Sequence, residues 1–474
     1  MTDLIVGPFN RVEGDLEVRL KIENGVVAAA YANSPLFRGF EMMLTGADPR
    51  DALTLTPRIC GICSISQSAA AAHALADAAG TKMTAQGALA AAILHGVENL
   101  ADHVTHFNLF FMPDFARSCY EGRAWHGAMV ERFTAAKGAS QHAALEARAR
   151  LFHITGILGG KWPHTLAIQP AGVTRIPDAA EKVRIVSVLR SFRRYLEGRL
   201  FGAPVEAFAA LSTASDLEGW AAGDVGLFLK ASADLGLEAF GRGPGRFLSF
   251  GAYPLAEGRA TRAGLWVDGA LSDIDSGQIV EHVAQSWMLG GPAHPFDGAT
   301  RPDEDMGDAG YSWCKAPRLG GATCEVGALA RQAVDGHPLA LALAGEGGVR
   351  ARIVGRLLEI ARTQVLLEEW ARALDPGAKF MGDFEVPKTG RGMGLVEAAR
   401  GSLGHWVVIE DGRIANYQIV APTTWNFSPR DAEGQPGPLE AALVGAPVAE
   451  GEDVPVTVQH IVRSFDPCMV CTVH

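Results

Sequence analysis

The chain opens with alternating apolar and polar positions. LEVRLKI (16–22) alternates strictly, and VVAAAYA (26–32) follows Asn24-Gly25, so residues 4–34 predict short strands joined by a tight turn. After Arg58 the apolar residues recur at helical spacing. This pattern predicts helices over 66–80, 84–112, 138–158, 177–200 and 349–374.

The helix predicted over 349–374 carries charged residues on one face, which is typical of an amphipathic helix. These residues are Arg350, Arg352, Arg356, Glu359 and Arg362. Gly- and Pro-rich segments at 241–262, 289–310 and 376–394 predict loops and short strands. Residues 405–420 predict a hairpin that turns at Asp411-Gly412. With no repeat and no long linker, we expect one mainly α, α+β domain over 1–474, with a central helical bundle and small peripheral β elements.

Charge and hydropathy exclude several functional classes. The 474 residues carry a formal net charge of −11 and no basic block, which disfavours binding to nucleic acid or to an anionic membrane. No apolar run approaches the roughly 20 residues that a membrane span needs. The N-terminus, MTDLIVGPFNRVEGD, has no basic region followed by an apolar stretch, so it does not read as a signal peptide and we expect a cytoplasmic protein.

The cysteines carry the strongest chemical signal. There are seven, an odd number that argues against a disulfide framework. Four form two C-x-x-C pairs, Cys60 with Cys63 and Cys468 with Cys471. Thiols at i and i+3 share one face of a helical turn, so two pairs can offer four thiolates to one soft metal ion. A structural zinc site and a redox disulfide within either pair are alternatives, but pairs about four hundred residues apart favour a site at the centre of the fold.

The sequence around these pairs resembles the large subunit of nickel–iron hydrogenases. R-x-C-G-x-C at 58–63 and D-P-C-x-x-C-x-x-H at 466–474 form its signature. Further segments match in the same order: FNRVEGD (9–15), FRGFE (37–41), YSWCKAPR (311–318), EVGALAR (325–331), EAARGSLGHW (397–406) and APTTWN (421–426). The resemblance therefore covers nearly the whole chain and implies the fold of that subunit.

The resemblance implies roles for the cysteines and for one arginine. Cys60 and Cys468 would be terminal nickel ligands, and Cys63 and Cys471 would bridge nickel to an iron that carries two cyanides and one carbon monoxide, an Ni–Fe(CN)2(CO) centre. H2 would be cleaved heterolytically, with the proton taken by a nickel-bound sulfur or by the guanidine of Arg400. An arginine is usually a fixed cation, so an ion pair of Arg400 with Asp114 or Asp466 is the alternative, and both aspartates match family positions around the metal.

Three more groups acquire expected roles in the same way. Glu13 matches the glutamate that relays protons, the alternative being a salt bridge with Arg11 or a distant cation. Glu41, a backbone carbonyl near Ile419 and His474 match the ligands of a Mg²⁺-type ion; for Glu41 an ion pair with Arg38 is the alternative. Thr423 and the backbone of Pro422 match groups that bond a cyanide, although Thr423 could be an ordinary turn residue.

Departures from the common pattern point to the regulatory, hydrogen-sensing branch. Gln67 stands where the motif usually has histidine, and a neutral amide cannot titrate near neutral pH. Ile62 and Phe110 stand where valine and leucine are common, at positions that line the gas channel, so they would narrow it; ordinary core packing is the alternative. Ala399 replaces the proline usual before Arg400. We interpret Cys119, Cys314 and Cys324 as buried thiols, and His103 and His106 as core histidines.

The resulting hypothesis is the large subunit of a hydrogen sensor of low turnover, which binds and cleaves H2, passes electrons to a small subunit with iron–sulfur clusters and reports through a histidine kinase. The alternative within the family is an energy-conserving uptake hydrogenase. A non-catalytic relative, the quinone-site subunit of respiratory complex I, ranks lower because it lacks the four cysteines, and a zinc-stabilised protein ranks lower still. The chain end at His474 is expected either as encoded or after removal of an extension.

Overall fold

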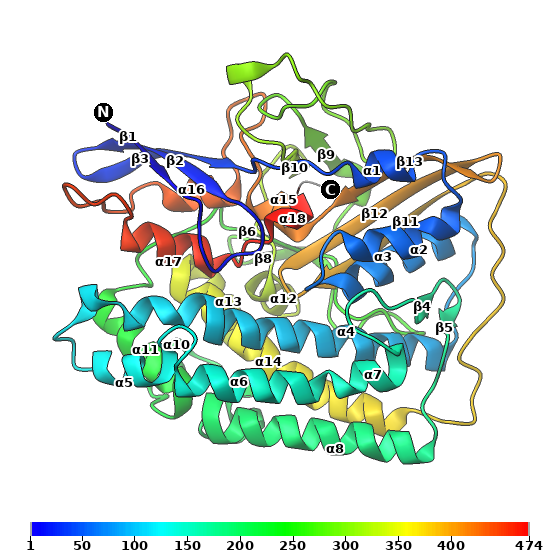
Figure 1. Cartoon of the computed structure of the whole chain (residues 1–474), viewed down its shortest axis with the longest axis horizontal. Helices are drawn as coiled ribbons and strands as arrows, with labels where there is room; N and C mark the ends of the chain where they lie inside the picture. The colour runs from blue at the N-terminus through cyan, green and yellow to red at the C-terminus, as the bar shows by residue number, and fades with distance from the viewer. Residues whose placement is uncertain (1, 473–474) are drawn as a thin grey trace.

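The computed structural model describes residues 2–472 of the chain. Long helices occupy one half of the molecule and small sheets most of the other, with the C-terminal segment between them (Figure 1). This is the predicted mainly α, α+β architecture. The longer helices are α3 (Ser64–Ala78), α4 (Ala85–Thr105), α5 (His126–Phe133), α6 (Ala139–Leu151), α8 (Ala179–Tyr195), α11 (Gly223–Leu235), α13 (Pro338–Glu346), α14 (Gly348–Ala373) and α17 (Val456–Ser464).

Shorter helices connect and cap this bundle. They are α1 (Phe40–Leu44), α2 (Ala52–Leu55), α7 (His153–Gly159), α9 (Val205–Ala209), α10 (Ala214–Glu218), α12 (Ala328–Val334), α15 (Pro422–Asn426), α16 (Pro438–Leu443) and α18 (Met469–Thr472). Two predicted helices end in a π-helical turn, at His106–Phe111 after α4 and at Leu196–Leu200 after α8. The segment predicted as one helix over 138–158 is divided into α6 and α7.

The sheets are antiparallel and small. Three have three strands: β1 (Thr2–Val6), β2 (Glu17–Glu23) and β3 (Val26–Asn33); β6 (Arg246–Ser249), β7 (Gly264–Val267) and β8 (Ala270–Ser272); β11 (Gly390–Ala398), β12 (Gly401–Glu410) and β13 (Arg413–Val420). Two-stranded pairs are β4 (Ile168–Gln169) with β5 (Gly172–Val173) and β9 (Ile279–His282) with β10 (Ala316–Leu319). The predicted hairpins at 16–32 and 405–420 are confirmed, and β11 adds a third strand to the second.

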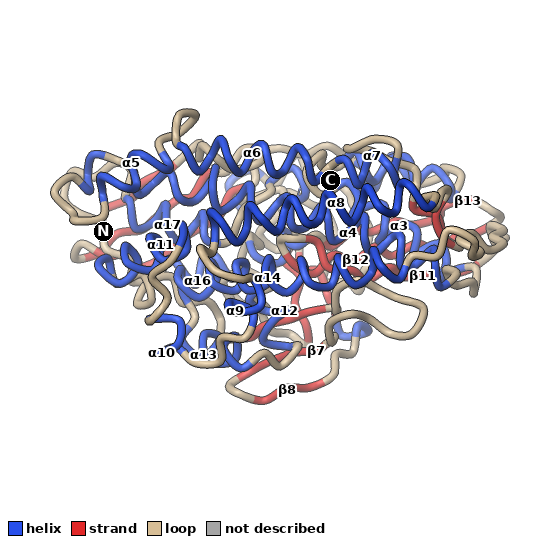
Figure 2. Tube along the Cα trace, turned by 90° about the horizontal axis from the view of Figure 1, so that it is seen from below, coloured by secondary structure: helices blue, strands red, loops and turns tan. Residues whose placement is uncertain are grey.

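The alanine-rich helix α3 packs directly on β11. Gly392 and Gly394 make this approach possible, because a Cβ at these positions would lie 2.2 Å from the carbonyl oxygen of Ala74 and 1.9 Å from that of Ala70. The first cysteine pair, just before α3, is therefore held against the sheet that also carries Arg400 between β11 and β12. In the view of Figure 2, α6 lies near the upper edge of the molecule and α14 lies below α6 and α8.

The amphipathic interpretation of residues 349–374 is wrong. Helix α14 is buried along most of its length, including Arg352, Arg356 and Glu359. Its charges are paired inside the protein: Glu359 accepts hydrogen bonds from Arg331 of α12 at 2.7 and 2.8 Å and lies 3.0 Å from Nε2 of His103. Because buried charges persist when they are paired, charge on this helix marks an internal network rather than a solvated face.

One continuous hydrophobic core runs from Val6 in β1 to Cys471 in α18 and includes Cys60, Cys63 and Cys468. Within residues 2–472, no helix combines the length and the apolar character needed to cross a membrane.

Candidate metal centre

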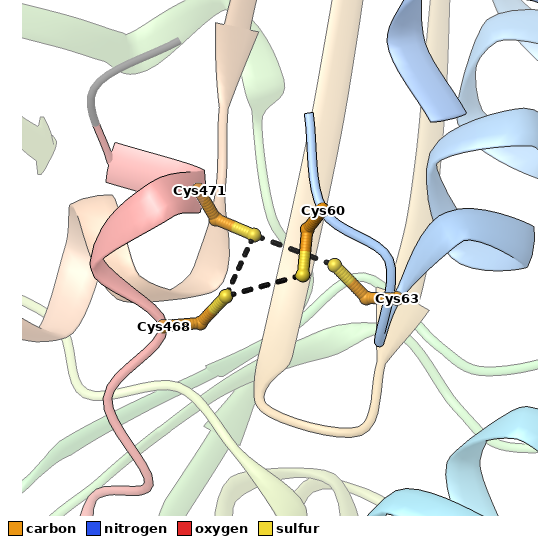
Figure 3. A group of neighbouring side chains, drawn as sticks. All are labelled: Cys60, Cys63, Cys468 and Cys471. Carbon is orange, nitrogen blue, oxygen red and sulfur yellow. Dashed lines mark hydrogen bonds between the residues drawn. The ribbon is translucent and has the colours of Figure 1, made fainter. Parts of the chain in front are cut away.

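The two C-x-x-C pairs meet in the middle of the protein. Their four Sγ atoms all lie within 4.8 Å of one another and are buried (Figure 3). Sγ of Cys60 lies 3.4 Å from that of Cys468, Cys63 lies 3.4 Å from Cys471, and Cys468 lies 3.1 Å from Cys471. The expectation of one central four-thiol site is met, since chain segments 408 residues apart converge on it.

Backbone contacts hold the C-terminal pair in place. Glu13 forms a parallel bridge with Cys468: its amide donates to the carbonyl oxygen of Pro467 at 3.3 Å, and its carbonyl oxygen accepts from Met469 N at 2.7 Å. The hydroxyl oxygen of Thr423 accepts a hydrogen bond from the amide of Cys468 at 3.2 Å. The predicted neighbours Thr423 and Pro422, in the first turn of α15, therefore lie next to the second cysteine pair.

The thiols influence one another's ionisation. Hydrogen bonds from the neighbouring thiols, first that of Cys468, and the charge of Arg400 hold the pKa of Cys60 well below its usual range. The hydrogen bonds with the same neighbours, together with burial, raise the pKa of Cys63. Four thiolates this close repel one another unless a cation lies between them, and four sulfur donors suit a soft divalent ion. The donor set therefore fits nickel, and by its chemistry alone it also fits zinc.

Arg400 lies at the tip of the β11–β12 hairpin, beside the thiols. Its terminal nitrogens donate to both carboxylate oxygens of Asp102, at 2.7 and 3.2 Å, and one of them donates to Asp466 Oδ1 at 3.2 Å. Its Nε donates to the backbone oxygen of Asp466 at 3.0 Å. The alternative pairing with Asp466 is thus present, whereas the sequence does not identify Asp102; the available signal was two acidic residues, Glu98 and Asp102, one turn apart in the helix predicted over 84–112.

Of the two aspartates offered as alternative partners of Arg400, Asp114 does not pair with it. Asp114, in the 3-10 turn Met112–Ala116 after the π-helical extension of α4, is fully buried and bonds Arg11 and Arg463 instead, the latter at 2.5 Å. Arg11 is thereby engaged away from Glu13, so the alternative of a Glu13–Arg11 salt bridge is not seen. Tertiary packing decides between aspartates that are equally plausible in sequence.

The two aspartates beside Arg400 share one cation. Burial raises the pKa of Asp102 to about 8, because Arg400 offsets only part of the effect and the charge of Asp466 adds to it. Burial alone would also raise the pKa of Asp466, but Arg400 and the nearby His106 and Arg356 hold it below its usual value. One carboxyl of the pair therefore stays ionised while the other holds a proton more readily.

Glu13 has the environment of a proton carrier. Its side chain is half-buried, and burial together with the negative charge of Cys60 raises its pKa, against the opposing charges of Arg400 and Arg38. A carboxyl with a raised pKa holds a proton more readily than an exposed glutamate, which suits a group that exchanges protons.

Glu41 lies in a polar cluster near the C-terminal segment. Its Oε1 accepts from Ile419 N at 2.7 Å and its Oε2 accepts from the hydroxyl of Thr300. The ammonium of Lys315 lies 3.4 Å from Glu41, and the alternative partner Arg38 bonds backbone oxygens of Ile59 and Val470 instead. Ile419 thus lies next to Glu41, but it contacts Glu41 through its amide and not through the carbonyl expected to bind the ion, and the third expected ligand, His474, falls outside the described residues.

The positions that suggested a narrow gas channel have distinct surroundings. Ile62 and Phe110 are both half-buried, and Ile62 packs against the main core. Gln67 is fully buried, with Oε1 2.7 Å from Nε2 of His405, whose Nδ1 lies 2.8 Å from the hydroxyl of Tyr417.

The remaining cysteines and histidines largely match expectation. Cys314 and Cys324 are buried, but Cys119 is exposed, which corrects its interpretation as a buried thiol. His103 and His106 are buried, and Nε2 of His106 bonds the backbone oxygen of Arg463 at 2.7 Å.

Comparisons with known proteins agree with this geometry. The family model "Nickel-dependent hydrogenase" matches residues 38–117 and 139–474. The chain is 31% identical over 509 residues to the periplasmic [NiFeSe] hydrogenase large subunit of Desulfomicrobium baculatum, covering 99% of this chain and 94% of that protein. It is 28% identical over 572 residues to the quinone-reactive Ni/Fe-hydrogenase large chain of Wolinella succinogenes, covering 99% and 95%.

A solved structure shows the same fold. The reduced, active form of the Ni-Fe-Se hydrogenase from Desulfomicrobium baculatum superposes with a TM-score of 0.86 at 29% identity, over 100% of both chains. Fold, family match and the central four-cysteine cluster agree. The chain therefore belongs to the nickel-dependent hydrogenase family and is a hydrogenase enzyme.

Proposed function

We propose that this chain is the large subunit of a hydrogen-sensing nickel–iron hydrogenase, in which Cys60, Cys63, Cys468 and Cys471 hold nickel. Cys63 and Cys471 are proposed also to bridge to the iron of an Ni–Fe(CN)2(CO) centre. The observation that carries this proposal is the convergence of four buried thiols within 4.8 Å in a member of a nickel-dependent family. When bound, that centre supplies the heterolytic cleavage of H2.

The residues around the four thiols transfer the proton released from H2 and supply a positive charge next to the thiolates. Glu13 accepts the proton at its carboxylate and passes it away from the thiols, a role supported by its raised pKa and by its backbone bonds to Pro467 and Met469. Arg400 keeps a fixed positive charge beside Cys60 and Cys468, since both aspartates raise its pKa further against the effect of burial. Thr423 orients the Cys468 loop and is proposed, with the backbone of Pro422, to bond a cyanide.

A Mg²⁺ ion held by Glu41, the carbonyl of Ile419 and His474 remains part of the proposal. The side-chain oxygens of Gln418, Glu41 and Glu281 surround the ammonium of Lys315. Oxygen ligands of this kind are the ones that a hard cation prefers. The lysine ammonium lies 2.6 Å from Gln418 Oε1 and competes with a metal ion for these oxygens.

A partner is required to carry electrons away. Among the described residues, the four central cysteines form one group of His, Cys, Asp or Glu side chains whose atoms are close enough to bind a single metal ion. No second group of this kind is found in that part of the chain. We infer that iron–sulfur clusters reside in a small subunit, as the names of the related large subunits and large chains suggest. A histidine kinase as signalling partner and a cytoplasmic location stay predictions.

The sensing role rests on three positions. Ile62 and Phe110 present larger side chains than the usual valine and leucine, and Gln67 is a neutral amide bonded to His405, where a titrating imidazole is usual. The second candidate is an uptake hydrogenase, a role carried by a relative named the uptake hydrogenase large subunit of Rubrivivax gelatinosus, which is 27% identical to this chain.

One assay separates the two candidates. Hydrogen-dependent dye reduction is measured for the complex of this chain with its small subunit, with and without air, after metal analysis of the same sample. Nickel and iron in equal amounts, with slow turnover that survives air, is the expected result. Fast turnover abolished by air would make the protein an uptake enzyme, and zinc in place of nickel would overturn the hydrogenase site itself.

A further inference from the structure

Glu98, in the middle of α4, is buried against the start of α3. Its carboxylate accepts hydrogen bonds from the amides of Ile65 and Ser66 at 2.8 and 2.9 Å and from the hydroxyls of Ser64 and Ser66 at 3.3 and 3.0 Å. The indole nitrogen of Trp162 donates a fifth bond at 3.1 Å. Five donors converging on one carboxylate fix the first turn of α3 relative to α4.

The residue before that turn is a proposed nickel ligand. Cys63 is the N-cap of α3, with φ −108° and ψ 33°, and its side chain makes no capping hydrogen bond. An N-cap side chain normally accepts from the N2 or N3 amide, here Ile65 or Ser66. Glu98 accepts from both amides in its place, while the Sγ of Cys63 turns to Cys471, 3.4 Å away.

We propose that Glu98 is a positioning residue of the metal centre: it caps α3 from the neighbouring helix and so leaves the Cys63 thiolate available to the metal. This inference rests on the proposed nickel site and deepens it. One helical turn further along α4, Asp102 bonds Arg400, whose charge acts on Cys60 and Cys468. Helix α4 thus determines the position of both the first cysteine pair and the guanidinium of Arg400.

The chain contains a matched control. Glu440 is equally buried and also caps a helix, in this case its own: it accepts from Gly437 N at the start of α16 at 3.4 Å, from Ala32 N at 3.0 Å and from the Tyr311 hydroxyl at 2.8 Å. Burial raises the pKa of both carboxyls to about 7. None of these partners, nor Arg430, whose Nε lies 4.0 Å from Glu440, belongs to the segment that carries Cys60 and Cys63, so Glu440→Gln reports the cost of losing a buried capping carboxylate away from the cysteines.

The experiment compares Glu98→Gln with Glu440→Gln in the complex with the small subunit. Nickel retention is titrated against a chelator, and the infrared bands of the carbon monoxide and cyanide ligands are recorded alongside the melting temperature. Glu98→Gln is expected to weaken nickel retention about 10- to 100-fold and to shift the infrared bands, as loss of a group that orients a ligand does. Glu440→Gln is expected to lower the melting temperature to a similar extent with both metal readouts unchanged.

The outcomes are distinct. Unchanged nickel retention and bands in Glu98→Gln would overturn the positioning role, and so would equal metal effects in both variants. Glu98→Asp, which keeps the charge, is expected to recover part of the nickel retention, and a failure to exceed Glu98→Gln would also count against the role. A wild-type complex without nickel would overturn the proposed function instead, so the two failures cannot be confused.

Discussion

Arg400 bonds Asp102 through both of its terminal guanidinium nitrogens, at 2.7 and 3.2 Å, directly beside the four-thiol cluster. The pair joins the tip of the β11–β12 hairpin to α4, and Asp466, two residues before Cys468, accepts from the same guanidinium. Planar, two-pronged contacts of this kind require arginine, because a lysine ammonium is a point charge on a flexible stem.

Arg400→Lys should therefore keep the charge but lose its orientation. We expect hydrogen oxidation to fall about 10- to 100-fold, as for other groups that orient a metal site, with nickel content unchanged. The control is Arg352→Lys, because Arg352 of α14 also makes a buried two-pronged contact, donating from Nε and Nη2 to Glu325 at 2.7 and 2.8 Å. Equal loss of activity in both variants would show a general effect of losing a buried arginine.

Cys60→Ser should abolish nickel retention. A hydroxyl is a harder and far less acidic donor than a thiol, so a soft divalent ion loses one of four ligands. Metal analysis of the purified complex measures this, with Cys324→Ser, another buried cysteine that matches no ligand position, as the control. Full nickel occupancy in Cys60→Ser would refute the ligand assignment.

Glu13→Gln should stop hydrogen/deuterium exchange while the metal site stays intact. The amide cannot carry the proton, and removal of a proton-transfer group typically costs about 10²- to 10⁴-fold. Its backbone bonds to Pro467 and Met469 do not involve the side chain, so the Cys468 loop should keep its position. Mass-spectrometric exchange of H2 with D2O tests the relay, and an unchanged rate would exclude it.

The double variant Ile62→Val with Phe110→Leu should make activity sensitive to oxygen. Smaller side chains at these half-buried positions would widen the path that the proposal assigns to gas. Hydrogen-dependent dye reduction is compared in air and in argon. If sensitivity is unaltered, both residues are ordinary packing residues.

Arg331→Met should destabilise the protein by about 3–5 kcal/mol, since it leaves Glu359 and Glu397 buried without their cation. Arg331 also donates to the backbone oxygens of Ala398 and Ala399 at 2.8 Å, so activity should fall through displacement of Arg400. The melting temperature of Arg331→Met is expected to be clearly lower than that of the wild-type protein.

The control is Arg391→Met, whose ion pair with Asp297 is exposed on both sides and is worth only about 0–1 kcal/mol. Similar melting temperatures in the two variants would contradict the importance of the buried network.

Local patterns predicted local structure well. The hairpins, the alanine-rich helices and the paired cysteines follow from periodicity, turn residues and spacing, all of which act over a few residues. Helix α14 failed as an amphipathic prediction because its charges find partners inside the protein: Arg352 pairs with Glu325, and Glu359 pairs with Arg331 of α12. The periodicity of a sequence shows where charged residues lie on a helix, but it does not show whether oppositely charged side chains lie next to them inside the folded protein.

The sequence by itself determined the helical and strand segments, the four thiols and the family to which they belong, because motif residues and short-range order are written along the chain. Only the tertiary structure decided that Asp102 rather than Asp114 faces Arg400, that Lys315 rather than Arg38 meets Glu41, and that Glu98 caps the helix after Cys63. These choices depend on which side chains are buried together, and burial is set by the packing of distant elements rather than by any local pattern.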